Sequence, residues 1–217
     1  MAFALAEPRR ATVAIDVETK LPDNTLAPVE PTCDAYEPEL RIVPMSLADY
    51  LAIEETKQKI EWVDGWAVYH MSPAMSDHGW LQIEIGVLLR QSLPTCSVHA
   101  DSGLNLNRSR RVPDLTVFPK KVPSQHFIAD VPIIAVEILS SSTREQDEVF
   151  KRAEYALAGI GQYWLVDPQY RRITVLNNSS SNWGAAIEIN REQPQADILV
   201  EGYGTVHIDI DELMPPE

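Results

Sequence analysis

The longest apolar run of the sequence, residues 132–139, reads Pro-Ile-Ile-Ala-Val-Glu-Ile-Leu and contains one charged residue, Glu137. A strand that is apolar on both faces is typical of the centre of a sheet that other elements cover on both sides. Residues 206–210 instead alternate apolar and polar side chains, as a strand with one wet face does. The pattern predicts a central strand at 132–139 and a half-exposed one at 206–210.

Three helices are predicted from periodicity and capping signals. A helix over 76–92 carries an apolar stripe that includes Leu81, Ile85 and Leu89, and ends before Pro94. A second helix, over 143–157, begins at a capping box spanning 142–145 and stops before Gly159. A short helix over 47–55 is capped by the Ser46 hydroxyl.

Further strands fill the spaces between these helices. The run 59–70 reads as a hairpin because Asp64-Gly65 tolerates positive φ at its centre. Additional strands are predicted at 97–100, 103–107, 111–118, 162–167 and 172–177. The helices alternate with strands, and one strand is buried on both faces. This arrangement indicates an α/β domain of three layers.

Length and composition favour one domain with an appendage. The chain has 217 residues, 45% of them hydrophobic and 23% charged, as in soluble globular proteins. Residues 1–40 hold five of the 16 prolines and no glycine, which predicts an acidic arm followed by a folded domain at 41–217. No apolar stretch reaches membrane-spanning length, no secretory signal is visible, and Cys33 and Cys96 lack zinc spacing. We therefore expect a soluble cytoplasmic protein with no membrane partner.

The net charge of −14 argues against binding to a polyanion, because like charges repel at long range. Five of the 18 cations nevertheless gather close to Asp114 in the sequence. They predict a positive rim able to contact DNA phosphates, and the alternative is an ordinary solvated loop. These residues are Arg108, Arg110, Arg111, Lys120 and Lys121.

The candidate chemistry begins with Glu137. A charged carboxylate in an apolar strand is costly unless a metal ion or a positive side chain compensates it. Asp114 poses the same question in a second strand, and two such acids in one sheet can form the oxygen-rich site that magnesium prefers. Lys151 lies in the next helix and can reach back toward Glu137, with Asp147 one turn earlier to orient it.

Several motifs in this order resemble the Uma-type restriction endonuclease family of the PD-(D/E)XK nuclease superfamily. They are Pro113-Asp114, Ala-Val-Glu-Ile-Leu-Ser-Ser-Ser-Thr at 135–143, the spacing Asp147-x3-Lys151-x3-Tyr155, and the run 158–168. Upstream runs at 60–68 and 71–80 extend the resemblance to about residues 45–213.

The resemblance implies a restriction-endonuclease-like fold, with a central mixed β-sheet flanked by helices, and a magnesium-dependent (or manganese-dependent) endonuclease that hydrolyses DNA. Asp114, Glu137 and the carbonyl of Ile138 would be the metal ligands. Lys151 would replace the superfamily lysine, whose usual position is occupied here by Leu139. Glu61 would be an additional catalytic acid, and His78 and Gln162, with Asp147, would be accessory residues.

A second hypothesis is a non-catalytic protein that uses the same fold for association. On this interpretation Glu137 and Lys151 form a purely structural ion pair, and the acidic arm serves assembly. Under either hypothesis we expect a homodimer or a larger homo-oligomer.

Overall fold

The computed structural model describes residues 40–54, 58–71, 76–141 and 143–216. The predicted arm therefore lies outside the described residues, except for Leu40, which begins the first strand. Ser142, in the predicted capping box, also lies outside them.

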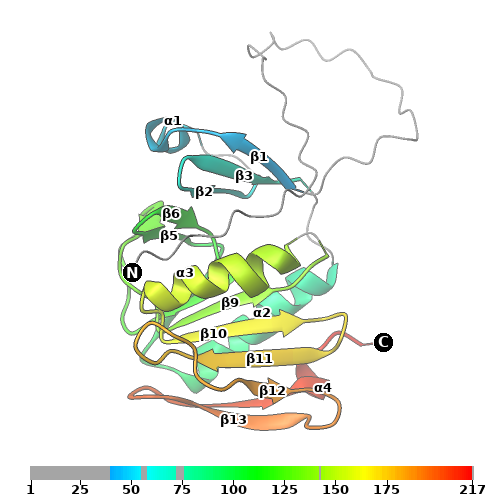
Figure 1. Ribbon diagram of the computed structural model, residues 1–217. Helices are drawn as coiled ribbons and strands as arrows, with labels where there is room; N and C mark the ends of the chain where they lie inside the picture. Colours follow the sequence, from blue (N-terminus) through cyan, green and yellow to red (C-terminus); the bar gives the residue numbers. More distant parts are fainter. Residues whose placement is uncertain (1–39, 55–57, 72–75, 142, 217) are drawn as a thin grey trace, which may run out of the picture.

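A six-stranded mixed sheet forms the centre of the molecule (Figure 1). The strand at its middle, β9 (Ile134–Ile138), runs parallel to β10 (Gln162–Asp167) and antiparallel to β7 (Leu115–Phe118), and all five residues of β9 are buried. This confirms the central strand predicted from the apolar run. In spatial order the strands are β12 (Ile187–Ile189), β11 (Arg172–Asn177), β10 (Gln162–Asp167), β9 (Ile134–Ile138), β7 (Leu115–Phe118) and β4 (Ser97–Ala100).

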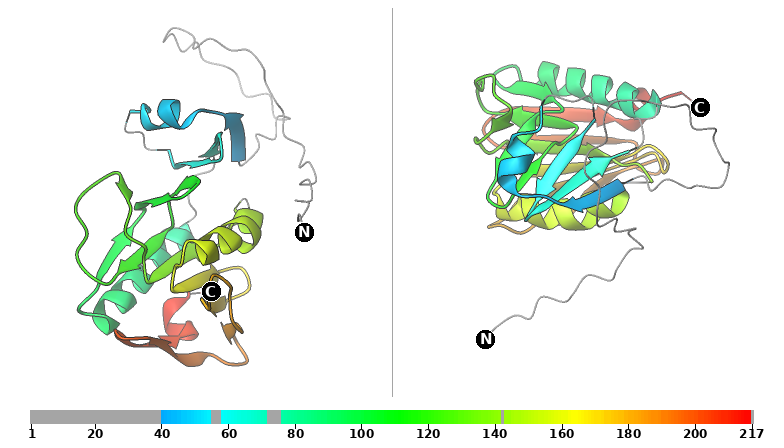
Figure 2. Two further views of the ribbon diagram at one scale, coloured as in Figure 1. Left: turned by 60° about the vertical axis from the view of Figure 1, so that its left-hand side comes forward. Right: turned by 90° about the horizontal axis from the view of Figure 1, so that it is seen from above.

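Helices cover both faces of this sheet, as the view from above shows (Figure 2). On one face, α2 (Ser76–Ser92) packs its buried Leu81, Ile85 and Leu89 against alternate residues of β9. The hairpin of β13 (Gln195–Val200) and β14 (Gly204–Asp209), with α4 (Ile210–Leu213), extends this core. The opposite face is covered by α3 (Arg152–Leu157). The predicted three-layer α/β architecture is confirmed.

A second six-stranded sheet lies toward the top of Figure 1. It contains the predicted hairpin, in which Asp64 and Gly65 have φ of 51° and 90°. Ser46 caps α1 (Leu47–Leu51) as predicted, although the helix ends four residues early. The strand order is β1 (Leu40–Pro44), β3 (Trp66–His70), β2 (Ile60–Val63), β6 (Ser109–Arg111), β5 (Gly103–Leu106) and β8 (Phe127–Ile128).

The strand predicted over 111–118 is divided between the two sheets. Strand β6 ends at Arg111 in the second sheet, and β7 begins at Leu115 in the central one. Pro113 has no N–H to donate to a ladder, so the strand breaks there. Asp114 consequently lies where the chain passes from one sheet to the other.

The helix predicted over 143–157 begins with a π-helical segment, η1 (Gln146–Lys151), before α3. At its start the Ser140 hydroxyl accepts a hydrogen bond from Thr143 N at 3.3 Å. Gly159, with φ of 81°, follows the last turn as predicted. No helix in these described ranges is both long and apolar enough to cross a membrane.

Candidate functional site

A cavity of about 1360 Å³ opens between the two sheets and the first turns of α2 and η1. Asp114, Glu137, Ile138 and Lys151 all line it, so the structure brings the predicted metal ligands and the predicted lysine to one place. Two predicted accessory residues, His78 and Asp147, line it as well. The antiparallel pairing of β7 with β9 explains the convergence, because the start of one strand meets the end of the other.

Asp114 is buried and held by three groups. Its Oδ2 accepts a hydrogen bond from the Ile138 amide at 2.7 Å, and its Oδ1 lies 2.8 Å from Lys59 Nζ. His78 Nε2 is 3.4 Å from the same Oδ1. Although burial opposes ionisation, Lys59 and His78 hold the pKa of Asp114 well below its usual value. Asp114 is therefore an ionised carboxylate at the cavity wall.

Glu137 faces the α3 side of the sheet, where its Oε1 accepts hydrogen bonds from Lys151 Nζ at 3.0 Å and from the Tyr155 hydroxyl at 2.9 Å. Burial raises the pKa of Glu137 to about 8; Lys151 lowers it, while Asp147 and Asp114 raise it. Glu137 thus lies where negative charge is in excess, and a further cation beside it would stabilise its ionised form.

Lys151 is enclosed by carboxylates. Its Nζ lies 2.9 Å from Asp147 Oδ1 and 3.4 Å from Glu61 Oε1, in addition to Glu137. Its side chain is 1% exposed, and these acids raise the pKa of Lys151 well above its usual value despite the burial. Lys151 is thus a buried ammonium that holds three acids together.

Glu61 is the centre of a second ion-pair group behind this one. Its carboxylate accepts hydrogen bonds from Arg111 at 3.2 Å and from Val112 N at 2.8 Å, and Arg111 also pairs with Glu154 at 2.8 Å. Lys151 and Arg111 lower the pKa of Glu61 well below its usual value, against the effect of burial. Glu61 does not line the cavity, so the structure places it beneath the site.

Gln162 is not part of the site. In the parallel register it pairs with Ile134, at the opposite end of β9 from Glu137. Its amide donates to Asn177 and to the Leu199 carbonyl, and its oxygen accepts from Trp164 Nε1 at 3.0 Å. Because successive strand residues advance by about 3.3 Å, sequence proximity to the motif did not indicate which strand end Gln162 occupies.

The five cations predicted as a positive rim do not form one. Arg111 is buried at 2% exposure, contrary to a DNA-contacting position, because Glu61 and Glu154 draw it inward. Lys120 and Lys121 follow the far end of β7, away from Asp114. Arg108 and Arg110 lie at the β5–β6 hairpin, where Arg108 pairs with Asp64 at 2.7 Å. These cations are close in sequence, but the division of the strand at Pro113 places the arginines in one sheet and the lysines after a strand of the other.

Lys59 and Tyr155 were not predicted as site residues. Tyr155 stood in the Asp147–Lys151–Tyr155 spacing, which places all three on one helical face. Lys59 is separated from Asp114 by 55 residues in the sequence, so no spacing rule joins them. One feature of the sequence could have indicated it: Lys59 comes two residues before Glu61, and residues two apart in a strand lie on the same face of the sheet.

The cavity wall is rich in carboxylates. Among the described residues it contains three Lys or Arg side chains, Lys59, Arg144 and Lys151, against six acids: Glu54, Asp77, Asp101, Asp114, Glu137 and Asp147. No cluster of three or more His, Cys, Asp or Glu side chains suited to a metal ion occurs in the described residues. Asp114 and Glu137 both line the cavity, and the Ile138 amide, next to Glu137, donates to Asp114.

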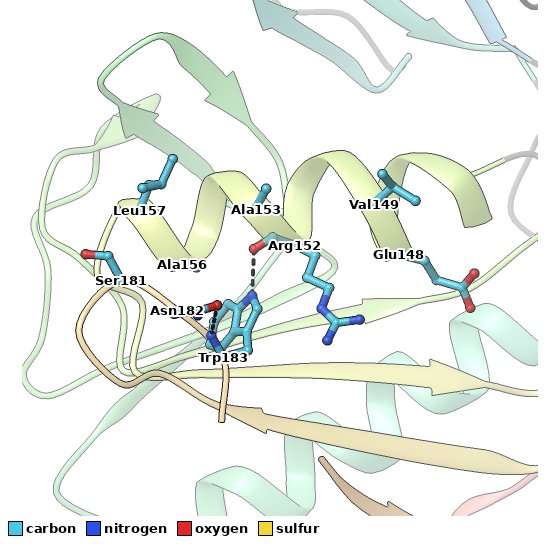
Figure 3. Close-up of a pocket in the computed structure, with 9 residues that line it drawn as sticks. All are labelled: Glu148, Val149, Arg152, Ala153, Ala156, Leu157, Ser181, Asn182 and Trp183. Carbon is cyan, nitrogen blue, oxygen red and sulfur yellow. Dashed lines mark hydrogen bonds between the residues drawn. The ribbon is translucent and has the colours of Figure 1, made fainter. Parts of the chain in front are cut away.

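A second, more open pocket of about 500 Å³ lies against α3 and the loop at 181–183 (Figure 3). Trp183 forms one wall, and its Nε1 donates to the Arg152 carbonyl at 2.7 Å. Glu148 and Arg152 are its only charged lining residues among those described. Without converging acids, this pocket offers no comparable chemistry.

Comparison with known proteins identifies the family and the fold of the chain. The family model Uma2, described as "Putative restriction endonuclease", matches residues 47–202. A crystal structure described as "a putative nuclease belonging to DUF820", from Anabaena variabilis, has a TM-score of 0.65 and 18% identity, covering 78% of this chain and 97% of that one. This likeness confirms the predicted fold class. No curated protein matches the sequence.

Proposed function

The chain belongs to the Uma2 family, and from this premise we propose that it is a magnesium-dependent nuclease that hydrolyses phosphodiester bonds of DNA. The observation that carries the proposal is the convergence of the Asp114 and Glu137 carboxylates on one cavity, in a wall with more acids than cations. Magnesium binds through one or two carboxylates, with waters and substrate phosphate completing its shell, so this donor set fits it. A structural zinc site would need more protein ligands.

Asp114, Glu137 and the Ile138 carbonyl would hold the ion. When bound, magnesium would polarise the phosphate and lower the pKa of an attacking water. Neighbouring side chains and one backbone amide hold the two carboxylates in position. Lys151 and Tyr155 fix Glu137 Oε1, while the Ile138 amide and His78 hold Asp114.

The acidic surface restricts how DNA can approach, because few cations line the cavity. We propose that the exposed Arg108, with Arg110, Lys120 and Lys121, supplies the phosphate contacts outside it. Binding through such phosphate contacts weakens as salt rises.

Thermal melts of Glu137→Gln with and without Mg²⁺ test the metal site. Glutamine preserves the volume but removes the charge, so the variant should lose the stabilisation that Mg²⁺ gives the wild type. That stabilisation is about 2.7 kcal/mol at a Mg²⁺ concentration 100 times Kd. Glu148→Gln, which removes a partly exposed carboxylate on η1, is the control and should keep the full response.

Cleavage assays on supercoiled and single-stranded DNA at low salt accompany these melts. A wild type with neither a Mg²⁺-dependent melt nor cleavage of any form would exclude the nuclease. The association scaffold would then be favoured by the exposed apolar side chains of η1 and α3, where Val149 is 57% and Leu157 is 75% exposed.

A further inference from the structure

The two lysines of the site have different surroundings. Lys151 contacts three carboxylates, within 2.9–3.4 Å, and is 1% exposed. Among the residues that the structure describes, Lys59 pairs with one carboxylate, that of Asp114, and its side chain is 25% exposed where it lines the cavity. The Lys151 ammonium is thus held in the protein interior by its acids. Lys59, in contrast, lies between the buried acids and the cavity that a substrate would enter.

We propose, on the basis of the proposed function, that Lys59 is the lysine that binds the scissile phosphate, and that it holds the cation position at Asp114 when no metal is present. On this view Lys151 is a positioning residue that keeps Glu137, Asp147 and Glu61 in place. The resemblance assigned the substrate-side role to Lys151 instead.

The surroundings of Lys59 allow such a movement. Its backbone is anchored in the hairpin edge, where the Lys59 carbonyl accepts from His70 N at 3.0 Å. Its ammonium, in contrast, is a point charge on a four-carbon stem and can change partners. A divalent ion at the Asp114 carboxylate would repel the ammonium from Oδ1. A phosphate entering the cavity would then offer the ammonium an anionic partner.

Lys151 lacks this freedom. Moving its ammonium into the cavity would leave Glu137, Asp147 and Glu61 buried without their shared cation, which is the costly way to break a buried pair. The Tyr155 hydroxyl alone would then remain as the donor to Glu137 Oε1 in the contacts described above.

The test compares Lys59→Met with wild type in two measurements on the full chain: Mg²⁺ binding without DNA by titration calorimetry at pH 8, and cleavage of single-stranded and supercoiled DNA. Removing the competing ammonium should tighten Mg²⁺ binding by about tenfold. Cleavage should fall by at least a hundredfold. A merely structural lysine would not move these two quantities in opposite directions.

Two variants control for charge and packing. Lys59→Arg keeps the positive charge and should keep the wild-type Mg²⁺ affinity. Arg90→Met removes a cation from the exposed end of α2 and should change neither measurement. Circular dichroism establishes that each variant is folded at the assay temperature.

Unchanged cleavage in Lys59→Met, or weaker Mg²⁺ binding by the folded variant, would overturn the role of Lys59 while leaving the nuclease proposal intact. A Lys59→Met variant that does not fold would also overturn it, since the proposal requires a lysine that can leave its partner. Failure of the wild type itself to bind Mg²⁺ or cleave DNA would instead exclude the proposed function, and this inference with it.

Discussion

The Asp114 side chain accepts a hydrogen bond from the Ile138 amide at 2.7 Å, and this bond ties the entry of β7 to the end of β9. Because Ile138 follows Glu137 directly, the bond also fixes how the two carboxylates lie relative to each other. The acid thus has two functions: it is a candidate metal ligand and a link between neighbouring strands.

Asp114→Asn separates these two functions. The asparagine oxygen can still accept from Ile138 N, whereas its neutral amide cannot pair with Lys59 or bind Mg²⁺ as a carboxylate does. We expect the free energy of unfolding to fall by about 1–3 kcal/mol and the Mg²⁺-dependent rise in Tm to disappear. Urea unfolding and thermal melts measure the two effects. A folded variant that keeps the full Mg²⁺ response would contradict the ligand role of Asp114.

The pH dependence of stability should report Glu137. Its pKa is raised to about 8 in the folded protein, against an ordinary value of 4.5, so the folded state holds a proton that the unfolded chain has released between these values. Its contribution to stability is therefore complete below pH 4.5 and is lost as pH rises through 8. Mg²⁺, which requires the carboxylate, should bind more tightly over the same rise and offset the loss.

Thermal melts between pH 5 and 9, with and without Mg²⁺, check this expectation. Glu137→Gln should remove the part of the pH dependence that Glu137 causes. An identical pH profile in wild type and variant would show that Glu137 does not titrate in this range.

Arg111→Met should strongly destabilise the fold. Arg111 is 2% exposed and pairs with Glu61 and Glu154, so its loss leaves buried negative charge uncompensated. The expected cost is about 3–5 kcal/mol. Arg108→Met, three residues earlier, removes an exposed pair with Asp64 and should cost at most about 1 kcal/mol. Urea denaturation of the two variants compares them directly, and equal costs would refute the buried role of Arg111.

Gln162→Ala tests the position of Gln162 away from the cavity. The change leaves Trp164 Nε1 and the Leu199 carbonyl without their present partner, so stability should fall by about 1–3 kcal/mol. Mg²⁺ binding to the folded variant should remain at the wild-type level. Calorimetric titration measures this, and a tenfold loss of affinity would place Gln162 in the site after all.

Periodicity predicted the elements that bury one clear face. Helix α2 has the predicted bounds because Leu81, Ile85 and Leu89 recur at helical spacing, and β9 was recognisable from its unbroken apolar run. Such patterns can be read from a short stretch of sequence, because they show which side chains of one element are buried. The break at Pro113 was not predicted, because the residues on both sides favour strand; the missing N–H of Pro113 was the signal that the strand divides between two sheets.

The site was predictable where the family motif and the strand ends coincide, as for Asp114 and Glu137. It was not predictable for Lys59, which reaches Asp114 through tertiary packing alone. Arg111 was misplaced for a related reason: a basic residue beside other basic residues is expected at the surface. The acids that pair with it lie 50 positions earlier and 43 positions later.

The π-helical segment η1 determines how many residues separate Asp147 from Lys151 along the helix. A π turn holds one more residue than an α turn, so deleting a single residue between Asp147 and Lys151 would leave a regular helix of almost the same length. Asp147 and Lys151 would then be three residues apart, a spacing that still places both side chains on one face of an α-helix. Homologous chains of this family that lack the extra residue should therefore carry the acidic partner of the lysine three residues before it rather than four.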